Sequence, residues 1–179
     1  MRFFLLFLLF FNLCAKTVFA GEIPTAVQKN LSAYNLIGSA PMKFMGLKVY
    51  DAALWSESKD FSYDRKFAIH IKYNMNFTKE NLAERSIDEI EETNDLSSRQ
   101  RQEYLQKLNE IFVNIKKGDE KVALFDPKNG VTLFYNNQKI GEISSLKFAR
   151  LFVDIWLDEK GSHPKVTKKL LGKINEKNS

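Results

Sequence analysis

The chain has 179 residues, 44% of them hydrophobic and 27% charged, with a formal net charge of +5 at pH 7. This length is enough for one domain with a substantial core. A single cysteine, Cys14, excludes a disulfide framework, and two histidines argue against a zinc site built on cysteine and histidine ligands. The basic residues do not gather with stacking aromatics, so we expect no nucleic-acid partner.

The first twenty residues have the pattern of a cleavable secretory signal peptide. Arg2 supplies a positive start, residues 3–11 are an unbroken run of Phe and Leu, and Val18-Phe19-Ala20 offers small or branched residues near a cleavage point. A membrane-spanning helix needs about 20 apolar residues, and this run stops at Asn12. We therefore expect cleavage after Ala20, no stable membrane anchor afterwards, and a periplasmic or secreted mature protein.

Residues 21–179 show no repeats or linkers, which predicts a single domain. Strict alternation of apolar and polar residues over residues 67–77 predicts a half-buried strand. Residues 36–55 predict one or two strands broken near Pro41. A meander of three strands is predicted over residues 121–125, 131–135 and 139–143, because turn residues separate these runs.

Four helices are expected between and after these strands. Thr78 is a good N-cap for the first helix, and Ser97 opens the second, which continues to Gly118. The third is predicted over residues 145–157 and the fourth over residues 164–172. This order predicts the α+β class, with an antiparallel sheet covered on one face by helices.

The titratable residues give little sign of catalysis. His70 belongs to the polar row of its predicted strand and is expected to face solvent, while His163 stands where the last helix begins. The acidic run Asp88, Glu89, Glu91 and Glu92 is typical of a solvated helix face. We expect no metal site and no cofactor.

Asp51 interrupts an otherwise apolar row of its predicted strand. A carboxylate in such a row is costly unless it is paired or hydrogen-bonded. We therefore interpret Asp51 as a structural polar residue that either is re-aimed by a bulge or has a partner such as Arg85 or Arg150. Lys48 and Tyr50 are predicted to point to the opposite side.

Several short segments resemble bacterial chalcone isomerase-like proteins. The segments occupy residues 36–40, 46–55, 83–87, 89–90, 117–119, 148–149, 155–157 and 170–172. Their order and spacing extend the resemblance over about residues 36–172, nearly all of the mature chain. The resemblance implies an open-faced β-sandwich with a ligand cleft between a large antiparallel sheet and its helices.

The same resemblance implies three kinds of role. The family contains plant isomerases that close a chalcone into a flavanone, fatty-acid-binding relatives, and bacterial members of other roles. The isomerases steady the substrate phenolate with an Arg on the first strand, ahead of a Thr on the next strand. Tyr50 stands at that Thr position here, as in the fatty-acid-binding branch, and no Arg occurs within residues 3–64. The missing cation counts against an enzyme, although Lys43 or Lys48 could substitute.

We therefore expect an exported, non-catalytic protein that binds a small apolar ligand, such as a fatty acid, in a sheet–helix cleft. One alternative is an intramolecular lyase or isomerase of the chalcone isomerase type, and another is an envelope interaction module without a ligand, whose protein partner the sequence does not indicate. In the enzyme alternative, the acting residues are Tyr50, Lys48 and Tyr73. The expected ligand-binding residues are Tyr50, Tyr73, Arg85, Ser86 and Trp156.

Overall fold

The structure is a computed structural model in which residues 22–174 are described. The predicted signal peptide, residues 1–20, lies outside the described residues. The strands are β1 (Asn35–Phe44), β2 (Leu47–Ser56), β3 (Phe67–Tyr73), β4 (Glu120–Asp126), β5 (Gly130–Tyr135) and β6 (Gln138–Ile143). The helices are α1 (Thr25–Asn30), α2 (Lys79–Glu91), α3 (Ser98–Ile111), α4 (Leu146–Leu157) and α5 (Pro164–Leu170).

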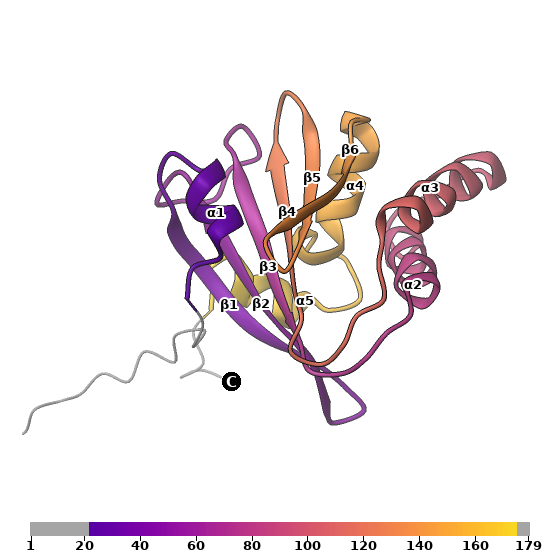
Figure 1. The fold of residues 1–179 in the computed structure, drawn as a ribbon, viewed down its shortest axis with the longest axis horizontal. Helices are drawn as coiled ribbons and strands as arrows, with labels where there is room; N and C mark the ends of the chain where they lie inside the picture. Colours follow the sequence, from indigo (N-terminus) through magenta and orange to yellow (C-terminus); the bar gives the residue numbers. More distant parts are fainter. Residues whose placement is uncertain (1–21, 175–179) are drawn as a thin grey trace, which may run out of the picture.

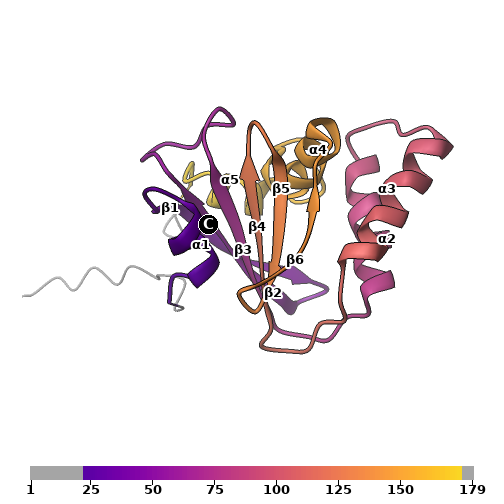
Figure 2. The same cartoon turned by 45° about the horizontal axis from the view of Figure 1, so that its top comes forward.

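The six strands form one antiparallel sheet whose spatial order follows the chain, from β1 to β6. Helices α4 and α5 pack behind this sheet, and α2 and α3 form an antiparallel pair beside them (Figure 1; Figure 2). The predicted α+β class, an antiparallel sheet with covering helices, is confirmed. None of the helices within residues 22–174 is long and apolar enough to cross a bilayer.

The main core lies between the sheet and helices α2 to α5. Alternation along β3 and β4 places Phe67, Ile69 and Ala123 on this inner face, where Ile87 from α2 and Phe152 from α4 pack against the same cluster. The predicted helix starts are confirmed as well, since side chains cap α2, α3 and α4. The capping residues are Thr78, Ser97 and Ser145.

A second, smaller core lies on the other face of the sheet, where α1 packs. Val27 of α1 belongs to one cluster with Trp55 and Leu124. His70 points to this covered face, is 0% exposed, and lies with its Nε2 3.2 Å from Glu120 Oε2. The expectation that His70 faces solvent is therefore wrong, because both faces of β3 are buried.

The break predicted near Pro41 lies instead at Met45-Gly46, where a hairpin turn joins β1 to β2 with φ values of 48° and 81°. Pro41 remains inside β1, opposite Asp51. Since β1 is the first strand of the sheet and has one free edge, a proline is tolerated there.

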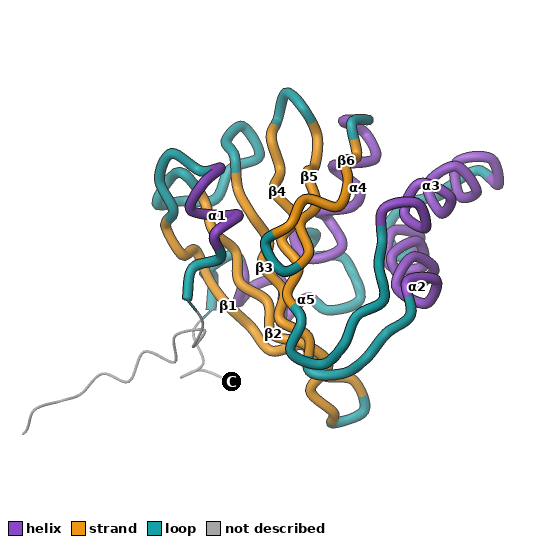
Figure 3. Tube along the Cα trace, in the orientation of Figure 1, coloured by secondary structure: helices purple, strands orange, loops and turns teal. Residues whose placement is uncertain are grey.

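Helix α3 is shorter than predicted and ends at Ile111 rather than near Gly118. Phe112 is already extended, and Ile115 forms an antiparallel bridge with Phe77 through N–H···O bonds of 2.8 and 3.0 Å. The predicted 67–77 strand likewise ends at Tyr73. The two segments beyond these element ends run side by side, joined by this bridge, and connect the helix pair to the sheet (Figure 3).

Candidate functional site: an apolar cavity between the sheet and the helices

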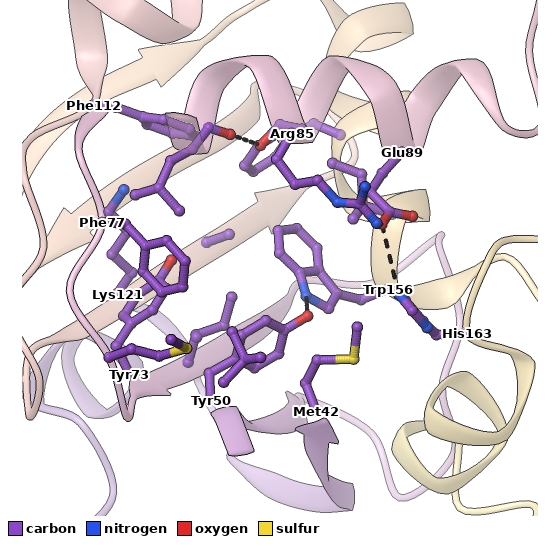
Figure 4. A pocket seen from close by; sticks show the side chains of 18 of the residues that line it. Met42, Tyr50, Tyr73, Phe77, Arg85, Glu89, Phe112, Lys121, Trp156 and His163 are labelled. Carbon is purple, nitrogen blue, oxygen red and sulfur yellow. Dashed lines mark hydrogen bonds and ion pairs between the residues drawn. The ribbon is translucent and has the colours of Figure 1, made fainter. Parts of the chain in front are cut away.

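A cavity of about 380 Å³ lies between the inner face of the sheet and the helices. Its walls come from five strands, from α2 and α4, and from residues just after α3 and just before α5 (Figure 4). Most of the lining is aliphatic or aromatic. Representative apolar residues are Met42, Ile71, Phe77, Leu82, Leu133 and Phe152.

The structure brings all five predicted ligand-binding residues to this cavity. Neighbouring strands β2 and β3 supply Tyr50 and Tyr73, which are paired directly in the sheet register. Helix α2 supplies Arg85 and Ser86, and α4 supplies Trp156. Their role toward a ligand stays a prediction, but their common location is a property of the fold.

The two tyrosines and the tryptophan form the middle of the cavity wall. Trp156 Nε1 donates a hydrogen bond of 3.1 Å to the Tyr50 hydroxyl, and the rings of Tyr50 and Tyr73 meet edge to face at 6.1 Å. Burial raises the pKa of Tyr50 to about 12 and also raises the pKa of Tyr73. Both phenols are therefore neutral near pH 7, able to hydrogen-bond but not to act as bases.

Arg85, Glu89 and His163 form a polar group on one side of the cavity. The Arg85 guanidinium forms an ion pair with Glu89 one helical turn later, and His163 Nε2 lies 3.6 Å from the same carboxylate (Figure 4). The Glu89 side chain is only 9% exposed, so the expectation of a solvated acidic face is wrong for this residue. It is buried because it shares the cavity-facing side of α2 with Arg85.

Ser86 also faces the cavity, but its hydroxyl is engaged within α2. The Ser86 Oγ donates a hydrogen bond of 2.8 Å to the carbonyl oxygen of Leu82. Such back-bonding to the preceding turn is common for serine inside a helix. Ser86 therefore presents mainly its methylene group and a hydroxyl oxygen that can still accept a hydrogen bond.

Lys121 on β4 is a cavity residue that the sequence analysis missed. It is 5% exposed, and its Nζ lies 3.8 Å from the centre of the Phe112 ring. Within residues 22–174, this nitrogen has no hydrogen-bond partner. Burial lowers the pKa of Lys121 to about 7. The sequence contains a signal for this location, because Lys121 begins an alternating row with Ala123 and Phe125 that has to face the core.

The two lysines suggested as substitutes for the missing arginine lie elsewhere. Lys43 is exposed on β1, and neither Lys43 nor Lys48 lines the cavity. Lys48 is half exposed, with its Nζ 2.8 Å from Asp51 Oδ2. Lys48 is therefore badly placed to act on a molecule held in the cavity, as the enzyme alternative required.

Asp51 is paired, but not with either arginine proposed for it. Its Oδ2 accepts a hydrogen bond of 3.2 Å from Asn74 Nδ2, in addition to the Lys48 ion pair. Arg85 pairs with Glu89 instead, and Arg150 pairs with a carboxylate of α4. The expected partners were wrong because Asp51 stands near the exposed end of β2, within reach of the loop after β3 rather than of the helices.

The arrangement suits holding a molecule more than transforming one. Its centre is apolar, with phenol and indole groups as hydrogen-bonding partners, and its charges lie at two separate places. Among the described residues, no cluster of three or more His, Cys, Asp or Glu side chains could hold a metal ion.

Comparison with known proteins places the chain in a family. A search of curated proteins finds no match. Among solved structures, the chain resembles a fatty-acid binding protein from Arabidopsis thaliana, with a TM-score of 0.63 and 12% sequence identity over 79% of this chain and 88% of that chain, which shows a shared fold. A sequence profile described as chalcone isomerase-like matches residues 15–172. Because this match covers most of its length, the chain belongs to the chalcone isomerase-like family.

Proposed function

We propose that this protein binds one small, largely apolar ligand, with a fatty acid as the leading candidate, and holds it without converting it. The observation that carries the proposal is the apolar cavity of about 380 Å³ between sheet and helices. Its size falls in the range of about 300–1,000 Å³ that is usual for small-molecule sites. A few polar groups on apolar walls are also the usual composition of such sites.

The family and the fold support this reading. The structurally similar Arabidopsis thaliana protein is described as a fatty-acid binding protein. The two proteins share little sequence, so the ligand of this chain has to be argued from its own cavity. Both hydroxyl-bearing strand residues, Tyr50 and Tyr73, carry phenols whose pKa values burial raises, which favours binding over proton transfer.

The location of this function is part of the proposal. Arg2, the apolar run over residues 3–11 and the Val18-Phe19-Ala20 end have the pattern of a secretory signal, so we propose that the mature protein acts in the bacterial periplasm or outside the cell. A protein that holds fatty acids outside the cytoplasm would shield their apolar chains from water, because an apolar cavity removes that surface from solvent.

The test begins with protein purified from its own compartment. We expect lipid extraction followed by mass spectrometry to release a fatty acid or a similar amphiphile, and stripped protein to bind added fatty acids at micromolar concentrations. Ala123 lines the cavity and is small, so Ala123→Phe is expected to fill the site and abolish binding. Leu146→Phe is the matched control, because Leu146 is exposed on α4 and does not line the cavity.

Three outcomes would contradict the proposal. Stripped protein that fails to bind any added fatty acid or fatty alcohol would exclude a carrier of apolar molecules. Closure of a chalcone faster than the spontaneous reaction would favour the isomerase. A protein partner that co-purifies with an empty, lipid-free chain would favour the interaction module.

A further inference from the structure

The cavity contains one cationic side chain that no described acid compensates. Arg85 has Glu89, which is the only carboxylate that lines the cavity within the described residues. Lys121 has neither an ion pair nor a hydrogen bond within residues 22–174, and its Nζ lies 3.8 Å from the centre of the Phe112 ring. A buried ammonium group is usually paired, because leaving water is costly for a charge.

We infer that Lys121 is the anchor for the acidic head of the ligand, so that the cavity selects an apolar chain ending in a carboxylate over its neutral counterpart. This inference rests on the proposed function and names the chemical class that the site prefers. The amine supplies the charge and hydrogen-bond donors that a carboxylate requires in an apolar place.

The position of Lys121 makes this contact favourable. Because the amine is already out of water before the ligand arrives, forming the ion pair requires little further desolvation of the protein. Its Nζ lies 3.8 Å from the centre of the Phe112 ring and is covered by protein atoms, so the flexible lysine side chain turns from that ring toward the cavity when it pairs with a ligand carboxylate.

The same geometry predicts the orientation of the ligand. Lys121 is 5% exposed and lies, with Phe112, on the opposite side of the cavity from Arg85 and His163 (Figure 4). The lining residues with exposed side chains include Phe44, at 59%, and Arg85, also at 59%. The head of the ligand therefore lies inside the protein, and its apolar chain extends past Tyr50 and Trp156 toward the open side.

Arg85 is the competing anchor, and its surroundings argue against it. Its guanidinium is neutralised by Glu89, and the side chain is more than half exposed. A ligand carboxylate placed there would meet the negative charge of Glu89 and the screening of water. The unpaired, buried amine of Lys121 is the stronger site for an anion.

The experiment compares dodecanoate with 1-dodecanol, which has the same chain length but no charge. Wild-type protein is expected to bind dodecanoate at least about tenfold more tightly, since hydrogen bonds to charged groups are worth more than neutral ones. Lys121→Met is expected to lose that preference while binding dodecanol almost unchanged. Lys43→Met is the matched control, because it removes a lysine that does not line the cavity.

A second measurement on wild-type protein does not depend on any variant. Burial lowers the pKa of Lys121 to about 7, so at about pH 8 the free protein holds this amine mostly neutral and dodecanoate binding has to draw in a proton. Calorimetry in two buffers of different ionisation enthalpy is expected to show this uptake for dodecanoate and none for dodecanol. The other titratable groups lining the cavity are Tyr50, Tyr73, Arg85, Glu89 and His163.

The outcomes separate this inference from the proposed function. If dodecanoate binds equally well to wild type and Lys121→Met, or if dodecanol binds more tightly than dodecanoate to wild type, the anchor is wrong while the apolar carrier stands. If Arg85→Met removes the preference and Lys121→Met does not, the head lies at the open side. If wild type binds neither probe, both the inference and the proposed function fail.

Discussion

Two residues of this chain show how a strand position decides the behaviour of a titratable group. His70 and Lys121 both belong to central strands of the sheet and both are at most 5% exposed. Burial is the main cause that lowers the pKa of each, although Glu120 acts in the opposite direction on His70. The two side chains point to opposite faces, so His70 lies on the face of the sheet that carries the second core, and Lys121 lines the cavity.

Lys121 leads to a prediction about pH and stability. Burial lowers its pKa from 10.5 to about 7, so between these pH values the unfolded chain holds a proton that the folded chain does not. The free energy of unfolding is therefore expected to rise with pH in this window, by at most about 1.4 kcal/mol per pH unit from this group. Chemical denaturation of ligand-free protein across the window measures that slope.

Lys121→Met supplies the control for this prediction. This substitution removes the titrating amine but keeps a flexible side chain of similar length. The variant is therefore expected to be more stable than wild type at neutral pH, and its free energy of unfolding is expected not to rise with pH between about 7 and 10.5. Tyr50 and Tyr73 oppose the trend only above about pH 10, in both proteins alike, because burial raises their pKa values. If the free energy of unfolding changed with pH equally in wild type and Lys121→Met, the burial of the Lys121 amine would be contradicted.

At the scale of elements, α5 packs against β1 with close contact between their backbones. Gly38 follows a register shift in the pairing of β1 with β2, and a Cβ built there would lie 2.0 Å from the carbonyl oxygen of Lys169. Gly172, with φ of 69°, lies just after α5, and a Cβ built there would lie 2.8 Å from the carbonyl oxygen of Ile37. The helix that covers the first strand can approach only because these positions carry no side chain.

Gly38→Ala is therefore expected to destabilise the protein. The added methyl group meets backbone atoms that cannot rotate away, so α5 has to move, at a cost of roughly 1–3 kcal/mol as for other overpacked sites. Gly161→Ala is the control, since a Cβ there has only Asp158 O, at 3.3 Å, as a near neighbour. Equal urea midpoints for both variants would show that α5 does not approach β1 this closely.

At the scale of the whole molecule, the ligand is expected to act as part of the core. A ligand present at about 100 times its dissociation constant stabilises the folded state by about 2.7 kcal/mol. For a domain of this size that corresponds to a rise in Tm of roughly 5–11 °C, which a thermal scan with dodecanoate measures. Ala123→Phe is expected to show no rise, whereas a rise of equal size in this variant would place the ligand outside the cavity.

Export is the second prediction at this scale. In a bacterial host the full chain is expected to be cut between Ala20 and Gly21 and recovered from the periplasm or the medium, as the charge and apolar run of its first residues indicate. Intact mass and N-terminal sequencing measure the cut. Leu8→Arg interrupts the apolar run and is expected to keep the chain uncut, and a wild-type chain that stays full-length inside the cell would contradict export.

The sequence by itself determined the α+β class, the meander, the starts of helices α2 to α5 and five residues that line one cavity, whereas α1 was not predicted. It could do so because alternation, helical spacing and capping are local: each is set by residues a few positions apart. Tyr50, Tyr73, Arg85, Ser86 and Trp156 were found in this way, from strand and helix faces and from the family resemblance.

Only the tertiary structure decided where α3 ends, which face of β3 is covered, and which lysine lines the cavity. Ile115 leaves the helical pattern because Phe77 pairs with it, and His70 is buried because a second core forms on its face. Lys121 differs from Lys48 only through what surrounds it: one lies beneath the helices and the other beside Asp51 in water. The cost of burying a charge depends on segments distant in sequence, so local patterns cannot supply it.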